Sequence, residues 1–279
     1  MSGESGDTRF DIGIVGGGPA GLSAAIWCAR YLHSVLLIDS GDPRNWETRG
    51  INGFLGLDGV RPAELRERGR EACRSLGVEL VNAIVLRVEQ TPDDRFAISL
   101  EGGGRNVVRR LLLAIGVRDL WPDIPGLDHV YGANAHVCPD CDGYDARGKK
   151  VVVIGHGRRA VGMALNLTTW TNDIIICTNG RPPDLDDAEY CAKLDALNIP
   201  VLTQPIVRVC CEGSRIHCLM LADGMQLDTD KVFFTIAQYP ADDLGVQLGC
   251  DRDDEGHIIV DEHCQTSVVN VYAAGDIIP

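Results

Sequence analysis

The sequence predicts an α/β protein made of two Rossmann-like, three-layer units. Two glycine-rich turns, at residues 16–21 and 155–160, are the main evidence for this prediction. Each turn follows a short apolar run (10–15 and 149–154) and precedes a segment of helical composition, which is the pattern of a buried parallel strand leading into a helix. A Cys-x-x-Cys pair at 138–141 stands just ahead of the second turn.

The first turn has the spacing of a dinucleotide-binding motif. Gly16 permits a tight turn, Gly18 lets a pyrophosphate approach the backbone, and Gly21 allows close packing of helix against strand. The next strand-like run, 34–38, closes on Asp39, whose carboxylate is placed to accept hydrogen bonds from ribose hydroxyls. We therefore predict a dinucleotide site here rather than a chance glycine-rich turn.

Further elements follow from hydrophobic periodicity and turn residues. Helices are expected at 22–32, 61–76, from the 155–160 turn to about 170, and at 189–197. Strands are expected at 78–88, 96–100, 107–114, 173–177, 201–221 (a pair around Gly213), 231–236 and 257–261. The irregular, proline-bearing connection at 121–126 is the expected domain boundary.

The second glycine turn lacks an acidic residue at the end of its following strand, which runs into Thr178, Asn179 and Gly180. Arg181 has the charge to meet a 2′-phosphate, but a loop arginine in solvent explains it equally well. Two dinucleotide sites around one dithiol indicate electron transfer between a flavin, a disulfide and a nicotinamide.

The Cys-x-x-Cys pair, taken alone, fits two kinds of site. Cys138 and Cys141, followed at once by the Asp142 carboxylate, can form a disulfide that opens and closes with proton transfer. The same spacing is half of a zinc site. Pro139 suits the first turn of a helix, where a thiolate is stabilised.

The remaining cysteines are candidates to complete a metal site. Cys210, Cys211 and Cys218 lie in the segment that reads as a hairpin, and no second Cys-x-x-Cys supports zinc there. We therefore predict no metal. Most of the 11 cysteines fall in apolar runs, as expected for buried free thiols in a reducing compartment.

Composition narrows the class further. The chain has 279 residues and a formal net charge of −14, which disfavours binding to nucleic acid. No apolar run approaches a membrane span, so we expect no membrane partner. The polar start, 1–11, has no apolar signal core, and a cytoplasmic location is expected.

In order and spacing, these motifs resemble those of the low-molecular-weight thioredoxin reductases within the FAD-dependent pyridine nucleotide-disulfide oxidoreductase family. The resemblance is carried by Gly16-Gly17-Gly18-Pro19-Ala20-Gly21, Cys138-x-x-Cys141-Asp142-Gly143, Gly155-x-Gly157-x-x-Ala160, and Thr266-Ser267 followed by Val271-Tyr272-Ala273-Ala274-Gly275-Asp276. It implies an FAD-binding domain from 1–118 and 244–279, an inserted NAD(P)-binding-like domain at 119–243 that carries the dithiol, and a homodimer.

The resemblance also implies roles for individual residues. In similar enzymes the second cysteine, here Cys141, faces the flavin, the first, Cys138, attacks the partner's disulfide, and Asp142 moves the proton. The implied FAD-binding residues are Gly16, Gly18, Pro19, Ala20, Gly21, Asp39, Asn52, Val85, Gly116 and Asp276, and those for NADPH or NADH are Gly155, Gly157 and Ala160.

The sequence departs from the family pattern mainly around the second turn. Arg159, Ala160, Gly162 and Met163 replace the usual Ser-Ala and paired glutamates, Thr178-Asn179-Gly180 replaces the arginines that grip NADPH, and Ile236-Ala237-Gln238-Tyr239-Pro240 replaces Ile-Gly-His-x-Pro. Similar proteins also continue beyond Gly-Asp with a further helix, whereas this sequence ends at Pro279.

The predicted function is a thiol–disulfide oxidoreductase of thioredoxin-reductase type. FAD passes electrons to Cys138–Cys141 and on to a thioredoxin-like protein or a small disulfide. The departures leave NADPH and NADH open as donors. The alternatives are a dithiol oxidase that uses oxygen, a reductase fed by ferredoxin, a non-catalytic flavin redox sensor and a structural zinc protein.

Overall fold

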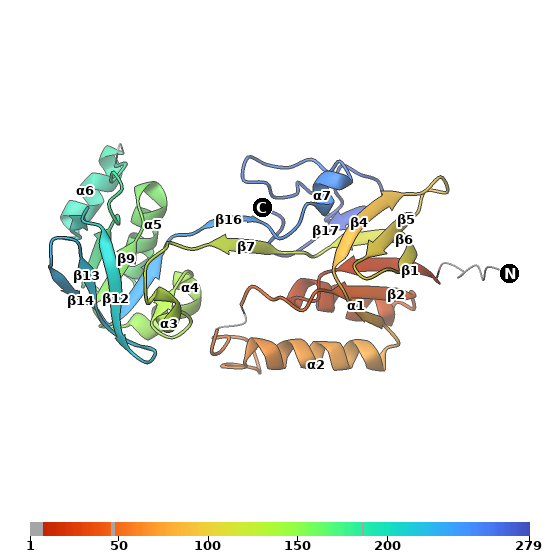
Figure 1. The fold of residues 1–279 in the computed structure, drawn as a ribbon, viewed down its shortest axis with the longest axis horizontal. Coiled ribbons are helices and arrows are strands. Elements are labelled where there is room, and N and C mark those ends of the chain that lie inside the picture. The colour runs from red at the N-terminus through yellow and green to blue at the C-terminus, as the bar shows by residue number, and fades with distance from the viewer. Residues whose placement is uncertain (1–7, 46–47, 186) are drawn as a thin grey trace. The chain divides into compact units, whose positions relative to one another are not determined.

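A computed structural model of the chain describes residues 8–45, 48–185 and 187–279 (Figure 1). The described residues fall into two compact units. Unit 1 takes those within 1–46, 62–119 and 238–279, and unit 2 those within 47–61 and 120–237. The sequence places the boundaries at 118/119 and 243/244. The structure differs most at 47–61, which the sequence assigns to the first domain and the structure groups with unit 2.

Unit 1 is built on a mainly parallel sheet. Its strands are β1 (Thr8–Val15), β2 (Val35–Asp39), β3 (Glu79–Asn82), β4 (Val85–Gln90), β5 (Phe96–Leu100), β6 (Arg105–Leu113) and β17 (Val271–Ala273), in the order β3-β2-β1-β6-β5-β4 with β17 also paired to β6. β1 runs parallel to β2 and β6, and β6 runs parallel to β17. The carboxyl ends of these four strands therefore share one edge of the sheet.

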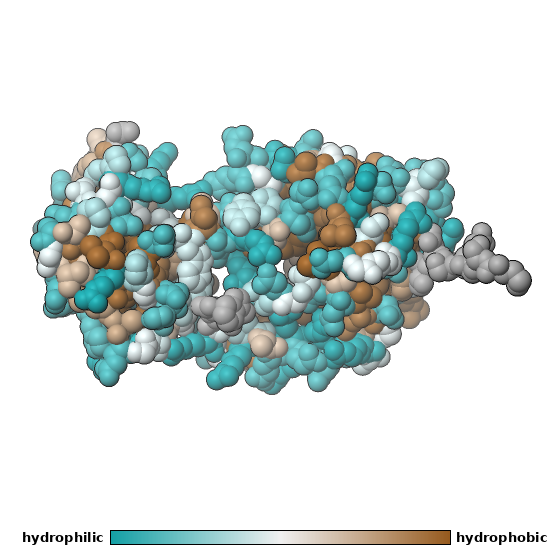
Figure 2. Space-filling view, in the orientation of Figure 1, coloured by the Kyte–Doolittle hydropathy of each residue, from teal (hydrophilic) through white to brown (hydrophobic). Residues whose placement is uncertain are grey.

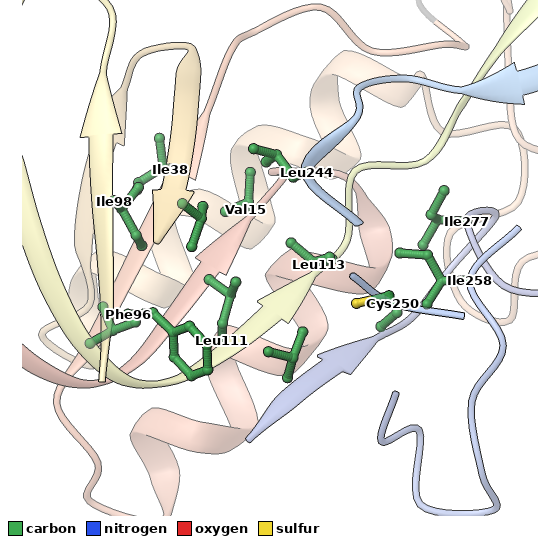
Figure 3. Packing of buried hydrophobic residues seen from close by; sticks show 14 of the residues in the cluster. Val15, Ile38, Phe96, Ile98, Leu111, Leu113, Leu244, Cys250, Ile258 and Ile277 are labelled. Carbon is green, nitrogen blue, oxygen red and sulfur yellow. The ribbon is translucent and has the colours of Figure 1, made fainter. Parts of the chain in front are cut away.

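The unit 1 sheet packs on both faces. Helices α1 (Pro19–Arg30) and α2 (Pro62–Ser75) bury Leu22 and Cys73 with Ile14 and Leu37 of the sheet. A second cluster joins the sheet to α7 (Leu244–Gln247) and to the chain's last segment, through residues such as Phe96, Leu111, Leu244, Ile258 and Ile277 (Figure 3). Fully burying side chains of this size contributes roughly 1.5–3 kcal/mol each.

Unit 2 has its own parallel sheet. Its strands are β8 (Ala135–His136), β9 (Val151–Ile154), β10 (Ile174–Cys177), β11 (Val201–Leu202) and β15 (Lys231–Phe234), in the order β11-β10-β9-β15-β8. Every neighbouring pair is parallel. The segments at its carboxyl edge therefore include both the second glycine turn, after β9, and Cys138, after β8.

Short helices and an antiparallel sheet complete unit 2. They are α3 (Leu127–Val130), α4 (Pro139–Asp142), the 3-10 turn η1 (Gly143–Ala146), α5 (Gly157–Leu167), α6 (Ala188–Ala196), β12 (Ile206–Glu212), β13 (Arg215–Leu221) and β14 (Gln226–Asp228). Strand β7 (Val117–Leu120) leads the chain out of unit 1 and pairs with β16 (Ala237–Pro240), which leads it back. Both units are α/β, as the sequence predicts.

Most predicted elements are present, and the differences have local causes. The hairpin around Gly213 is confirmed as β12 and β13. The single run 78–88 is instead two strands, because the chain breaks at Ala83, whose N–H donates to the Asp39 carbonyl 3.1 Å away. The prediction of a strand at 257–261 is wrong, because this segment forms only isolated β-bridges. Ile258 is apolar because it packs in the core, and its burial does not depend on a continuous strand.

The surface seen in Figure 2 is largely hydrophilic. Hydrophilic residues, drawn in teal, cover much of the face of each unit seen in Figure 2. Within the described part of the chain, none of the helices combines the length and the apolar character needed to cross a membrane.

Candidate active site

The first glycine turn is fixed by close backbone packing. The N–H of Gly16 donates to the Ile38 carbonyl near the end of β2, at 2.8 Å. Gly16 has φ +109°, and a Cβ there would collide with the carbonyl oxygen of Ala114. A Cβ at Gly21 would collide with the Gly16 carbonyl oxygen. Only glycine fits either position: at Gly16 both the conformation and the space exclude a side chain, and at Gly21 the space alone does.

Gly18 is different because the space beside it is open. It caps the N-terminus of α1 in an extended conformation (φ −76°, ψ −177°), with Pro19 as the first helical residue. A Cβ built at Gly18 meets nothing within 4 Å in the described chain. An open glycine at the start of a 12-residue helix leaves backbone N–H groups and the positive end of the helix dipole available to a diphosphate.

Asp39, the predicted ribose acceptor, is held by two arginines. Its side chain is buried, and Oδ2 lies 2.8 Å from Arg66 Nη2 and 3.2 Å from Arg70 Nη1. Oδ1 accepts from the Gly41 N–H at 3.2 Å. A carboxylate has about four acceptor sites, so one remains for a ligand hydroxyl. The contacts of Arg66 and Arg70 with Asp39 were not predicted from the sequence, although the i, i+4 spacing of the two arginines places them on one face of α2.

Asp276 lies at the same sheet edge, just beyond β17. Its Oδ2 is 2.9 Å from Arg44 Nη1, and Arg44 Nε is 2.9 Å from Asp119 Oδ1. Burial works against the charge on Arg44, but the hydrogen bonds to Asp119 and Asp276 outweigh it and raise its pKa. The neighbouring Gly275 packs against Ala20, where an added Cβ would meet the Ala20 methyl group. The sequence did not single out Arg44.

The other predicted cofactor residues lie in different places. Gly116 follows β6 with φ +67°, and no described atom would contact a Cβ there. Val85 starts β4, is partly buried and packs against the core cluster of Figure 3. Asn52 belongs to unit 2, where its Nδ2 donates to the Cys141 carbonyl at 3.1 Å. The structure therefore brings Asn52 to the dithiol within unit 2.

The second glycine turn is covered by its own chain. Gly155 donates its N–H to the Cys177 carbonyl at 3.0 Å, and a Cβ there would collide with the side chain of Thr235. Gly157 begins α5 with φ +62°. Its N–H, which a bound diphosphate would need, donates to the Pro183 carbonyl at 2.9 Å.

The covering segment is residues 181–184, which we call the strap. His156, inside the turn, is held from both sides: Nδ1 lies 3.0 Å from Asp184 Oδ2 and Nε2 lies 3.2 Å from Arg181 Nη1. Ala160 is buried in the core beneath α5. Arg181 therefore binds His156 in this structure, an arrangement that the sequence analysis did not consider.

The dithiol occupies the start of α4. Cys138 and Cys141 form a disulfide with Cα atoms 5.4 Å apart. Cys138 is the N-cap, its sulfur accepts from the Cys141 N–H at 3.2 Å, and Pro139 follows as the first helical residue. The predicted helical start at Pro139 is confirmed. A proline costs nothing there, because its missing N–H would have had no partner.

Two carboxylates flank Cys141 and differ in their surroundings. Asp140 is exposed and accepts from Asn166 Nδ2 on α5 at 3.2 Å. Asp142 is half-buried, and its Oδ2 lies 3.3 Å from Nδ1 of the buried His136. Asp142 therefore has an imidazole beside it, whereas the partner of Asp140 is a neutral amide. His136 stands two residues before the first cysteine, but no sequence pattern singled it out.

Comparison with known proteins identifies the family. The model of the pyridine nucleotide-disulphide oxidoreductase family matches residues 10–279. The chain belongs to this family. Its members are enzymes that use FAD together with NAD(P)H. The family resemblance, the fold class and the use of FAD that were predicted from the sequence are therefore confirmed.

Among curated relatives, thioredoxin reductase tcpT of Claviceps purpurea is 30% identical over 275 residues, which is 94% of this chain and 85% of that protein. A longer relative from Arthroderma benhamiae is 31% identical over 188 residues, 65% of this chain and 46% of its own length.

Among solved structures, HlmI superposes with a TM-score of 0.91 at 33% identity, covering 100% of this chain and 87% of its own. Thioredoxin reductase from Streptococcus pyogenes has a TM-score of 0.90 at 23% identity over 98% of this chain and 90% of its own, which supports the fold alone.

The geometry of unit 1 fits FAD. The open Gly18 at the start of α1 suits the diphosphate, the free acceptor position of Asp39 suits the adenosine ribose, and Asp276 offers a further carboxylate at the same edge. Bound FAD supplies reversible two-electron chemistry.

The four buried cysteines outside the disulfide are less suited to this redox chemistry. Burial raises the pKa of Cys73, Cys177 and Cys250, and burial together with the Cys210 thiol raises the pKa of Cys218 to about 11. A thiol with a raised pKa is a poor nucleophile. Among the residues that the structure describes, no group of three or more His, Cys, Asp or Glu side chains is placed to hold a metal ion.

Proposed function

We propose that this member of the pyridine nucleotide-disulfide oxidoreductase family works as a thiol–disulfide oxidoreductase through Cys138 and Cys141. The observation that carries the proposal is their disulfide at the start of α4, with Asp142 beside it and bound to the buried His136. Bound FAD would supply the two-electron chemistry for this disulfide, and Cys141 would be the cysteine that faces it.

In the proposed reaction the reduced pair attacks a substrate disulfide. The Cys138 thiolate bonds to one substrate sulfur, the substrate S–S bond breaks, and the leaving thiolate takes a proton from the solvent. Cys141 then gives its proton to the Asp142 carboxylate and attacks the Cys138 sulfur. The second substrate thiolate leaves with that proton, so two electrons and two protons reach the substrate and the enzyme disulfide re-forms.

The substrate that we propose is a thioredoxin-like protein or a small disulfide, reduced by a homodimer in the cytoplasm. The names of the relatives support the thioredoxin-like partner. Cys141 is exposed and Cys138 is partly buried beside it. Within unit 2, therefore, the disulfide is accessible to a substrate.

An anaerobic experiment tests the proposal. The FAD-loaded protein is mixed with NADPH, NADH or a reduced dithiol, and bleaching of the flavin band is recorded, followed by reduction of a small aromatic disulfide. Cys138→Ser and Cys141→Ser are expected to lower disulfide reduction at least about a hundredfold, because the nucleophile or its resolving thiol is gone. Cys264→Ser, which changes an exposed free cysteine, is the control. Equal rates in all four proteins would contradict the proposal, and no turnover in the wild type would favour a non-catalytic flavin sensor.

The strap over the second glycine turn favours a second candidate, a dithiol oxidase. The Gly157 N–H is bonded to the Pro183 carbonyl, so a nicotinamide dinucleotide would have to displace the strap before its diphosphate could bind there. A reduced dithiol that reacts directly with the Cys138–Cys141 disulfide needs no such displacement. In this direction a dithiol substrate reduces Cys138–Cys141 and oxygen finally takes the electrons. Bleaching by dithiol alone, with recovery in air, would select the oxidase. Bleaching by NADPH or NADH would select the reductase, and a flavin that only ferredoxin reduces would select the ferredoxin-fed alternative.

A further inference from the structure

A buried polar pair lies behind the disulfide. His136 ends β8 and Lys231 begins β15, the parallel strand next to it. Their side chains are nearly fully buried, at 5% and 4% exposure. Nζ of Lys231 lies 3.1 Å from Nε2 of His136. Burying such groups is costly unless they are hydrogen-bonded, so a specific arrangement holds them there.

The surroundings of the lysine define which way its hydrogen bonds point. Nζ donates to the Ala133 carbonyl at 2.8 Å and faces His136 Nε2. Burial lowers the pKa of Lys231, and the charged groups that bear on it are Lys149, Asp145, Asp142 and Arg49. Two of these four are carboxylates, and Asp142 is the one that contacts His136.

These contacts fix the histidine tautomer. A lysine ammonium can only donate, so Nε2 of His136 is the acceptor and its ring proton is on Nδ1. Nδ1 is the atom that faces Asp142 Oδ2 at 3.3 Å. Lys231 therefore donates to Nε2 of His136, and the protonated Nδ1 of His136 faces the carboxylate of Asp142, the residue next to Cys141.

We propose that His136 and Lys231 are positioning residues that orient Asp142 and set the pH at which it exchanges a proton with the dithiol. The proposal rests on the proposed function, in which Asp142 carries the proton of Cys141. Without the chain of donors, a half-buried carboxylate would hold its proton to higher pH. With the chain, the positive charge of Lys231 favours the ionised form that can accept the proton of Cys141.

Asp140 provides an internal contrast. It flanks Cys141 on the other side, yet it is exposed and bonded to the neutral amide of Asn166. The two carboxylates therefore differ in their partners: Asp140 accepts from a neutral amide, whereas Asp142 faces an imidazole that is bonded to the buried Lys231.

A spectroscopic test needs no turnover. In protein labelled with 15N-histidine, the His136 signal is assigned as the one that disappears in His136→Phe. In the wild type this signal is expected to show the Nδ1–H tautomer. Lys231→Met, which retains the length of the side chain without the charge, is expected to release that tautomer and to raise the pH at which His136 titrates. Lys193→Met, at an exposed lysine paired with Glu189, is the control. An Nε2–H tautomer in the wild type, or an unchanged His136 signal in Lys231→Met, overturns the proposal.

A kinetic test separates positioning from packing. In Lys231→Met the acid limb of the pH profile for disulfide reduction is expected to move up by about one pH unit, which is about a tenfold lower rate on that limb. His136→Asn keeps a donor where Nδ1 stands and is expected to retain more activity than His136→Phe, whose ring can still pack against Phe233. His129→Asn, at an exposed histidine, is the control.

The two tests separate the possible failures. If the wild type reduces no disulfide, the proposed function fails, and the tautomer still decides whether the chain of donors exists. If a variant does not fold, the wild-type tautomer alone decides. A parallel loss of rate at all pH values in both His136 variants, with no shift of the acid limb in Lys231→Met, would mean a merely structural role and would overturn the proposal.

Discussion

The two glycine turns share a backbone design and differ in what lies over them. Gly16 and Gly155 both donate their N–H to a carbonyl near the end of a neighbouring parallel strand, at 2.8 Å and 3.0 Å. Beside Gly18, in the described part of unit 1, the space is open. At the second turn the Gly157 N–H is already bonded to Pro183.

The contrast teaches that glycine spacing reports the turn and not the ligand. The first turn has Asp39 at the end of the next strand, at the edge where a ribose would lie. The second has Thr178 after β10, and its hydroxyl donates to the carbonyl of Arg181 at the start of the strap. The same strand–turn–helix unit therefore leaves an open helix start in one unit and supports a loop of its own chain in the other.

The largest expected effect follows from the collision at the first turn. Gly16→Ala is expected to lower the free energy of unfolding by about 3 kcal/mol or more, because the new methyl meets the Ala114 carbonyl as well as an unfavourable φ. Gly102→Ala is the matched control, since Gly102 also has positive φ (+79°) but open space around it. Denaturant unfolding measures both. Equal losses would show that the collision relaxes without cost.

The open glycine gives the next effect. Gly18→Val is expected to weaken FAD binding by about tenfold or more, the cost of one lost charge-assisted hydrogen bond, while the unfolding free energy of the FAD-free protein changes little. Gly157→Val is expected to lower the free energy of unfolding, because Gly157 has φ +62°, and to leave FAD affinity nearly unchanged, because Gly157 lies in the other unit. FAD titration and denaturant unfolding measure the pair. Loss of FAD affinity in both variants would break the comparison.

Loosening the strap is expected to have a smaller effect. Asp184→Ala removes the contact to His156 and is expected to increase NADPH or NADH affinity by up to about fivefold, the worth of an exposed ion pair. Glu189→Ala, at an exposed residue of α6, is the control. Calorimetric titration measures both. A fall in affinity would instead mean that the strap itself binds the nucleotide.

The smallest effect is a pH dependence at the start of unit 1. The Ser34 backbone N–H, and then its hydroxyl, hold the pKa of Asp11 below its ordinary value of 3.8. Since the folded pKa is the lower one, the stabilisation is present above that ordinary value and is lost as pH falls through the folded pKa. Asp11→Asn is expected to cost less than about 1 kcal/mol at neutral pH. Denaturant unfolding at neutral and acidic pH checks it, and a cost that persists at acidic pH would contradict the assignment.

The sequence by itself determined the local units. The strands before both glycine turns, the hairpin around Gly213 and the helical start at Pro139 all follow from patterns within about 20 residues. Such patterns act through backbone conformation and neighbouring contacts, which the chain carries wherever it is placed. The order of the motifs was also enough to indicate the family and its FAD.

Only the tertiary structure decided which distant residues meet. Lys231 reaches His136 across 95 positions because β15 and β8 become parallel neighbours. Asp39 meets Arg66 and Arg70 because α2 packs beside the first turn, and the strap reaches Gly157 from beyond β10. Each contact depends on the order of strands in a sheet, and parallel crossovers leave no short-range signal of that order in the sequence.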